Sequence, residues 1–293
     1  MKVEFHADDF GLFVGQSERI LRCFQSGALN GVSILTNGED LEQCLALIQS
    51  SAGDLDIAVH LNFLQGKSKS EQQNVDLLTD KDGYFNLRFV ELLFSSYGRK
   101  RNLYKQQLKR EIIEQINTLK GFCEEHGKRI RIDSHAHWHM IPVVFDALME
   151  GIKEEGLDVE YIRIPDEPVG LLIRNARHLI PFKPINIIKM LVLHLLAKRN
   201  LRKYRDSLRN MEKKVFTGVL LSDAFTYEKA SFLLPKIKTY AAKRNAGVEL
   251  LAHPGKVTET DDIKRITNAD DMAFFLSPHR DSEAEMFIKM KKA

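Results

Sequence analysis

The chain has 293 residues, of which 44% are hydrophobic and 28% are charged, and its formal net charge is +3. That length is enough to bury a full apolar core and suits one large α/β domain. The three cysteines are odd in number and form no C-x-x-C pair, which argues against a disulfide framework and a thiolate metal site. The N-terminus shows no secretory signal pattern, so we expect a cytoplasmic protein.

Short runs rich in β-branched or aromatic residues recur between turn residues and predict about seven strands. They cover residues 3–6, 32–36, 57–62, 130–133, 161–164, 217–221 and 248–252. Helical periodicity lies between them, most clearly over residues 103–122. Strands and helices in alternation predict a parallel sheet, either an open doubly wound sheet or a closed barrel. No repeat, low-complexity tract or linker divides the sequence, so we expect one domain over residues 1–293.

Polar residues that suit catalysis or metal binding lie at the carboxyl ends of five of the predicted strands. They are Asp8 and Asp9, His60, His135, Arg163 and His253. In an α/β barrel the carboxyl ends of the strands meet at one mouth, where the active site lies. The pattern therefore favours a barrel over an open sheet.

The first of these groups lies in the stretch HADDFG, residues 6–11. Because side chains alternate along a strand, we expect Asp8 and Asp9 to point to opposite faces, one toward a metal ion and the other toward water. Alternatively, the aspartates cap the helical pattern that begins near Val14. A cap accounts for one aspartate and leaves the histidines on the other strands unexplained.

Three histidines alternate directly after the fourth predicted strand. They are His135, His137 and His139, and Asp133 precedes them. If this stretch is extended, all three rings point to one face and into a cavity. The alternative is an exposed polar strand edge.

A single histidine, His60, ends the third predicted strand. Alone it is as consistent with a hydrogen-bonded structural residue as with a ligand. Together with Asp9 and His135 it completes a set of two imidazoles and one carboxylate, which leaves open coordination positions on a divalent ion. These ligand types do not name the metal.

Two further residues suit roles in catalysis. His253 precedes a proline and glycine turn, and its imidazole suits proton transfer near neutral pH, although a hydrogen-bonded loop histidine is an equal alternative. Arg163 has a fixed positive charge that is able to keep Asp8 ionised. Its alternative partners are the structural acids Glu160 and Asp166.

Six short motifs occur in the order typical of one known family, the YdjC-like carbohydrate deacetylases. They are HADDFG at 6–11, GALNGVSILTNG at 27–38, VHLNFLQGK at 59–67, RIDSHAHWHMIP at 131–142, RIP at 163–165 and VELLAHPG at 248–255. Together they span nearly the whole chain, which therefore resembles this family from end to end.

The resemblance implies a distorted (β/α) barrel of the polysaccharide deacetylase type. It also implies a hydrolase that uses one divalent metal ion, zinc or magnesium, to remove the N-acetyl group from an N-acetylglucosamine-type sugar. Carried over by position, Asp9, His60 and His135 resemble the metal ligands and Asp8 the catalytic base. His253 falls on the expected acid, and Arg163 on the arginine that steadies the base.

The resemblance leaves four residues in supporting or substrate-contacting roles. They are His6, Asp133, His137 and His139. His6 departs from the family, which usually has asparagine at this position, so the hydrogen bonding around Asp8 is in question. The metal ligand set is unaffected.

A basic helical insertion is expected at about residues 167–214. Its part from residue 174 to residue 214 holds twelve Lys or Arg and only two Asp or Glu. This segment resembles the hopanoid-associated branch of the family, which implies a lipid-linked substrate rather than a free oligosaccharide. Apolar residues at helical spacing followed by basic ones are typical of a helix that contacts an anionic membrane surface.

Alternatively, this segment forms an ordinary amphipathic barrel helix with a solvated cationic flank. Aromatic residues are too sparse among the basic ones to indicate nucleic acid binding. Nothing in the sequence fixes the oligomeric state, so a homo-oligomer stays open.

Two other functions stay open. An amidohydrolase or phosphoesterase barrel also uses a His-x-His pair, which His135 and His137 supply, although such enzymes generally place that pair on the first strand. A catalytically silent protein that binds glycans or membranes is the second alternative.

Overall fold

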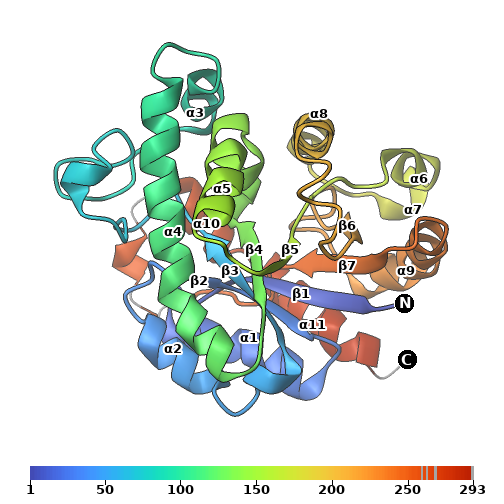
Figure 1. Cartoon of the computed structure of the whole chain (residues 1–293). Helices are drawn as coiled ribbons and strands as arrows, with labels where there is room; N and C mark the ends of the chain where they lie inside the picture. The colour runs from blue at the N-terminus through green and yellow to red at the C-terminus, as the bar shows by residue number, and fades with distance from the viewer. Residues whose placement is uncertain (259, 262, 267–268, 292–293) are drawn as a thin grey trace.

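Seven parallel strands form one sheet, which curls into an incomplete barrel (Figure 1). The computed structural model describes residues 1–258, 260–261, 263–266 and 269–291. The strands are β1 (Val3–Phe10), β2 (Gly31–Leu35), β3 (Asp56–Leu61), β4 (Ile130–Ser134), β5 (Val159–Ile162), β6 (Lys214–Thr217) and β7 (Gly247–Ala252). Their order across the sheet is β5-β4-β3-β2-β1-β7-β6, and every neighbouring pair is parallel. The predicted α/β fold with seven parallel strands is confirmed.

Helices cover the outside of the curled sheet and fill the connections between the strands. They are α1 (Val14–Ser26), α2 (Leu41–Ile48), α3 (Phe89–Ser95), α4 (Arg101–Glu125), α5 (Pro142–Glu154), α6 (Val169–Arg174), α7 (Ala176–Leu179), α8 (Pro184–Lys203), α9 (Tyr227–Ala242), α10 (Ala269–Phe275) and α11 (His279–Lys291). The predicted helix at 103–122 forms the greater part of α4, and its apolar residues Leu108, Ile112 and Ile116 are fully buried. Among the described residues, no helix has both the length and the apolarity that a bilayer crossing requires.

The sixth strand lies earlier in the chain than the sequence predicts. It covers Lys214–Thr217 instead of 217–221, because Gly218 takes a φ of 153° and ends the extended run. The buried carboxylate of Glu167 then accepts hydrogen bonds from the backbone N–H groups of Gly218 and Leu220 (2.8 and 2.9 Å). These bonds hold the expected strand residues in a turn.

The two edge strands of the sheet, β5 and β6, approach one another at their amino ends. There the N–H of Glu212 donates to the carbonyl of Glu160 (2.8 Å). Beneath this seam the fully buried carboxylate of Glu4 accepts hydrogen bonds from the guanidinium of Arg131 (2.8 and 3.0 Å) and contacts the ammonium of Lys214. A buried ionic cluster therefore ties the seam together at the end of the barrel opposite the predicted site.

Candidate metal centre and active site

Both aspartates of the first strand point into the same site, against the expectation that they face opposite ways. The pairing of β1 with β2 shifts register between Ala7 and Phe10, and Asp9 takes a left-handed φ of 69°. As a result, the Nε2 atom of His60 lies 3.9 Å from Asp8 Oδ2 and 3.6 Å from Asp9 Oδ1. A bulge with a strained residue thus places two carboxylates where a regular strand presents one, as is common beside active sites.

Asp9, His60 and His135 converge at the mouth from the ends of β1, β3 and β4. Their ligand atoms all lie within 4.8 Å of one another, and all three residues are buried. His135 Nδ1 is 2.9 Å from Asp9 Oδ1, and the two imidazole rings meet edge to face with centroids 5.8 Å apart. The sheet therefore brings together the set that the sequence predicts as metal ligands.

The surroundings of this triad fit a bound cation. The Nδ1 atom of His60 bonds Asp133 Oδ1 (2.6 Å), whereas its buried Nε2 atom has no hydrogen-bond partner among the described residues. Ligating histidines commonly hold a carboxylate through one ring nitrogen and the metal through the other. An unpartnered imidazole nitrogen, aimed at a carboxylate and a second imidazole, is what a divalent ion requires.

Charge around the triad keeps the carboxylate of Asp9 ionised. Burial alone raises the pKa of Asp9, but the adjacent His135, His60 and Arg280 hold it well below its usual range. Arg280, from α11, is fully buried and donates from Nη2 to Asp9 Oδ2 (2.8 Å). One oxygen of Asp9 is thereby fixed by the arginine, and the other faces the two imidazoles.

Arg163 pairs with Asp8 and not with the structural acids that the sequence offers as alternatives. Its Nη1 atom lies 2.9 Å from both oxygens of Asp8 and 2.8 Å from Asp133 Oδ2. Its Nε atom donates to Glu249 Oε1 (2.7 Å). Three buried carboxylates thus surround one buried guanidinium, which fixes the position of Asp8 beside the triad.

The alternative acids have other partners. Glu160 lies 3.3 Å from the guanidinium of Arg131, and Asp166 is 2.6 Å from His194 Nδ1. Neither is available to Arg163.

His6 lies beneath the site as a support. Its Nδ1 atom bonds Glu4 (2.6 Å), and its Nε2 atom bonds the hydroxyl of Ser33 (2.6 Å). That hydroxyl in turn donates to Asp133 Oδ2. Its Nε2 atom is 3.8 Å from Asp8 Oδ1, so His6 lies beside Asp8 without a hydrogen bond to it.

The three alternating histidines do not form a strand, so the prediction that they share one face is wrong. Strand β4 ends at Ser134, and His135–Met140 forms a 3-10 turn in which Ala136 and His137 are left-handed (φ 50° and 59°). Only His135 reaches the triad.

The other two histidines of this turn lie beside the arginine. His139 bonds Ser134 Oγ (2.6 Å) through Nδ1 and donates from Nε2 to the carbonyl of Arg163 (2.7 Å). His137 packs edge-on against Phe216, and its buried Nδ1 atom has no hydrogen-bond partner among the described residues. Burial is the main cause that holds the pKa of His137 well below its usual value, and the positive charge of Arg163 lowers it further.

His253 follows β7, which pairs with β1 on the side away from β2 and β3. Its backbone N–H donates to Glu283 Oε2 (2.5 Å), and its ring meets Phe274 edge-on with centroids 5.1 Å apart. Burial alone lowers the pKa of His253, but the carboxylate of Glu283 and the charge of Asp9 raise it above its usual value. The ring therefore favours the protonated form that a proton donor requires.

Sequence reasoning missed the residues that α11 and β7 contribute. Glu249 interrupts an apolar strand, and a charge in such a run is a signal that was available. Arg280 and Glu283 lie in a helix rich in charged residues, where nothing in the local pattern marks them. The contacts that Arg280 and Glu283 make in the site are visible only in the folded structure.

A family model described as YdjC-like protein matches residues 2–291. Curated relatives named carbohydrate deacetylase include one from Danio rerio, 28% identical over 60% of this chain and 53% of its own length. A second, from Thermoanaerobacter pseudethanolicus, is 30% identical over 56% of this chain and 61% of its own length. The aligned region thus spans between half and two thirds of these two relatives. One from Clostridium beijerinckii is 23% identical over 85% of this chain and 93% of its own length.

A solved structure supports the fold. A protein from Enterococcus faecalis that is named for cellobiose-phosphate cleavage superposes with a TM-score of 0.63 at 16% identity. The match covers 99% of this chain and 92% of that one. At this identity the likeness concerns the fold alone.

Proposed function

The chain belongs to the YdjC-like family, and from this premise we propose that it is a metal-dependent carbohydrate deacetylase. The proposed reaction hydrolyses the acetamide of an N-acetylglucosamine-type sugar and releases acetate and a free amine. Relatives named carbohydrate deacetylase support the sugar substrate. The buried Nε2 atom of His60, which has no protein partner among the described residues, is the observation that carries the metal dependence.

Asp9, His60 and His135 are the residues that would hold the ion. A divalent cation there would polarise the acetyl carbonyl and lower the pKa of water, as in other hydrolytic metal sites. The protein contributes a fixed geometry, because Arg280 anchors Asp9 and Asp133 anchors His60. Buried polar anchors of this kind set the ring orientation of the ligands.

Asp8 is the proposed general base. Its Oδ2 atom lies 3.9 Å from His60 Nε2, and Nη1 of Arg163 donates to the carboxylate. Asp8 therefore faces the same space as the triad but is not one of the three proposed ligands. It takes a proton from the water that attacks the acetyl carbon. General base catalysis of this kind contributes about 10²–10⁴-fold to the rate.

His253 is the proposed general acid. It donates a proton to the nitrogen of the sugar as the C–N bond breaks, which releases a neutral amine. Glu283 and Asp9 favour its protonated form, as the direction of its pKa shift requires. The ring of His137 has a nitrogen without a hydrogen-bond partner among the described residues, and we propose that it contacts substrate. His6, Asp133 and His139 are proposed to position the catalytic groups.

Acetate release from a panel of N-acetylglucosaminyl compounds tests this function. The purified protein is first stripped of metal, and Zn²⁺, Mg²⁺, Mn²⁺ and Ni²⁺ are then restored one at a time. We expect acetate release with at least one ion and none from the stripped protein. Phosphatase activity with two bound ions would instead favour a phosphoesterase, and tight glycan binding without acetate release a silent homologue.

We also propose that α8 lets the enzyme reach lipid-linked substrate at an anionic membrane surface. The inner face of this helix is buried through Met190, Leu193 and Leu196, as in any amphipathic barrel helix. Its outer face exposes apolar side chains, with Ile188 58% and Leu195 65% exposed. Exposed apolar patches of this kind mark interaction surfaces.

The same outer face continues into exposed basic residues. Lys198 and Arg202 follow Leu195 at helical spacing, and both are exposed. Apolar contact and positive charge are thus aligned on one stripe, which suits the boundary of an anionic bilayer.

Flotation with anionic liposomes tests this membrane contact. We expect binding at low salt and release at high salt, because surface charges are screened. The variant K198E/R202E should lose binding, whereas K238E/K243E, which makes the same charge change on and just after α9, should keep it. Liposome binding that does not change with salt, or an equal loss of binding in both variants, would contradict the proposal.

A further inference from the structure

Two segments of the chain carry nearly all of its exposed apolar side chains. Apart from Met1 and Tyr84, every exposed large apolar residue in the described part of the chain lies within residues 90–103 or 173–201. The second segment includes α8, whose outer face is the membrane contact proposed above. The first covers α3 and the start of α4, outside the set of proposed catalytic residues. We call the exposed side chains of these two segments the α3–α8 surface.

The short helix α3 has apolar side chains both toward the core and toward solvent. Leu92 is fully buried, and Leu93 packs against the core beside it. Val90 and Phe94, one helical turn apart, are 58% and 70% exposed, and Tyr97 just after the helix is 74% exposed. Exposed apolar side chains that gather in this way mark an interaction surface.

Helices α3 and α8 lie on either side of α5, and both are anchored at the mouth of the barrel (Figure 1). Phe89, the first residue of α3, meets the ring of Trp138 edge-on with centroids 6.0 Å apart. From α8, Asn200 Nδ2 donates to the carbonyl of Met140 (2.9 Å). Trp138 and Met140 both belong to the turn that follows β4 and begins with the proposed ligand His135. The α3–α8 surface therefore borders the mouth.

A buried carboxylate of α5 collects cations from both sides of this surface. Asp146 is only 2% exposed, and Arg101 Nη2 from α4 and Lys203 Nζ from α8 lie 2.6 and 2.9 Å from its oxygens. Arg199 of α8 donates to the same carboxylate from Nη1 and Nη2 (2.8 Å each). Three cations share one negative charge, so the cluster retains a net positive charge.

The sequence on both sides of the cluster adds to this positive charge. Residues 99–105 hold four Lys or Arg and residues 174–205 hold nine, and neither stretch contains Asp or Glu. A second copy of the chain would bring the same charge to the contact, and like charges oppose such an interface. An anionic bilayer offers the opposite charge at its surface and an apolar interior for the exposed side chains. The charge therefore favours a membrane over a second copy.

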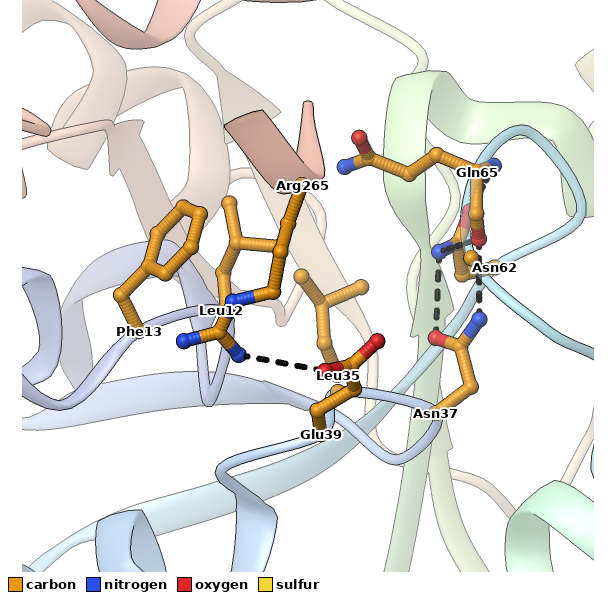
Figure 2. Close-up of a pocket in the computed structure, with 10 residues that line it drawn as sticks. Leu12, Phe13, Leu35, Asn37, Glu39, Asn62, Gln65 and Arg265 are labelled. Carbon is orange, nitrogen blue, oxygen red and sulfur yellow. Dashed lines mark hydrogen bonds and ion pairs between the residues drawn. The ribbon is translucent and has the colours of Figure 1, made fainter. Parts of the chain in front are cut away.

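The rim of the mouth at the ends of β1, β2 and β3 has neither feature (Figure 2). There Arg265 is paired with Asp40 (3.0 Å) and Glu39 (3.6 Å), so its charge is balanced. The apolar residues Phe13 and Leu35 of this rim are buried. The basic and apolar residues thus border the mouth on one side, which gives docking a direction.

From these observations we infer that α3 is a second membrane anchor, and that an anionic bilayer covers the α3–α8 surface on both sides of α5. The inference rests on the proposed function and extends it, because the contact proposed there involves α8 alone. Phe94 and Tyr97 enter the boundary between headgroups and acyl chains, and the cations that share Asp146 face lipid phosphates. The mouth then lies beside the membrane, where the acetylated headgroup of a lipid reaches it directly.

Binding to mixed vesicles of phosphatidylglycerol and phosphatidylcholine compares Y97S with Y84S. Each variant removes one exposed tyrosine ring, but only Tyr97 belongs to the α3–α8 surface. We expect Y97S to bind about tenfold more weakly than the parent protein, the effect of one aromatic ring that no longer leaves water. Y84S should bind as the parent protein does. Equal binding by the parent protein and Y97S would overturn the second anchor.

Tryptophan fluorescence tests insertion of α3 directly. Trp138 is the only tryptophan of the chain and is buried, so F94W adds an exposed probe at a position where the fold is spared. With anionic vesicles we expect the emission of F94W to shift to the blue and to be quenched by brominated acyl chains. The control Y84W should show neither change.

The variant L195W carries the same probe on α8 and separates the two anchors. We expect L195W and F94W to respond alike. A blue shift of L195W without one of F94W would overturn the second anchor and leave the α8 contact standing. Absence of acetate release from soluble substrates would overturn the proposed deacetylation, whereas the two spectra would still decide whether α3 inserts.

Discussion

Both ends of the barrel bury carboxylates among cations, but the buried groups at the two ends are paired to different extents. At the amino ends of the strands, Glu4 accepts bonds from Arg131 and contacts Lys214. At the carboxyl ends, Asp9 is bonded by Arg280 and His135, but His60 keeps one nitrogen without a protein partner among the described residues. The first cluster closes a seam, whereas the second leaves His60 Nε2 free to bind the proposed cation.

This difference shows how the same kinds of residue serve stability at one end and binding at the other. Buried charges cost free energy unless they are paired, and the seam cluster meets that cost with direct ion pairs. At the mouth, the proposed cation would supply part of this compensation. Substitutions at the two ends should therefore separate stability from activity.

The largest effect is expected for H135A. Removing one imidazole leaves two ligands, so the protein should lose its metal and with it essentially all acetate release. Elemental analysis of the purified variant measures the metal content directly. A variant that retains a full equivalent of metal would show that His135 is not a ligand.

D8N should separate chemistry from metal binding. The amide keeps the size of the side chain but cannot take a proton, so turnover should fall by about 10²–10⁴-fold while the metal content stays as in the parent. Initial rates and elemental analysis on the same preparation check both outcomes. Undiminished turnover would remove Asp8 from the role of base.

At the other end, K214M should lower stability and spare activity. The ammonium of Lys214 is fully buried against Glu4, so its removal leaves a buried carboxylate with fewer cations and should cost about 3 kcal/mol. Urea unfolding measures that loss, and acetate release per folded molecule should be unchanged.

The matched control for this variant is K2M, at the same end of the barrel. Lys2 pairs with Asp56 (2.6 Å), but its side chain is 48% exposed, so this change should cost less than about 1 kcal/mol. Equal losses in the two variants would mean that burial does not distinguish the pairs.

The elements that the sequence predicts well are those with strong local patterns. Asp9 and His60 lie near the carboxyl ends of β1 and β3, and His135 directly follows β4. Parallel strands bring their carboxyl ends to one edge whatever the details of the loops. The convergence of these three residues was therefore predictable from three separate stretches. The ends of individual strands were less predictable, because Gly218 and the carboxylate of Glu167 end β6 through contacts distant in sequence.

The remaining parts of the site depend on tertiary structure. The bulge at Asp9 arises from the register of β1 against β2, which no local pattern encodes. The left-handed Ala136 and His137 break the alternation that an extended stretch would have, and no glycine in the sequence marks this turn. Arg280 reaches Asp9 from 271 positions away, which only the packing of α11 reveals.

The last prediction concerns the pH dependence of stability and tests whether the buried imidazole of His139 stays neutral. Burial, only partly offset by the hydrogen bond to the Arg163 carbonyl, lowers the pKa of His139 to about 4. The unfolded chain, with an ordinary histidine pKa of about 6.5, binds the proton more readily, so the free energy of unfolding falls as the pH drops from about 6.5 to about 4. The full loss is roughly 3 kcal/mol. H139Q should lack this loss, whereas H279Q, which removes an exposed histidine, should keep it. Urea unfolding at pH 7 and pH 4 measures how far the free energy of unfolding of each protein falls. An equal fall in the parent and H139Q would show that the imidazole of His139 takes up its proton without loss of stability.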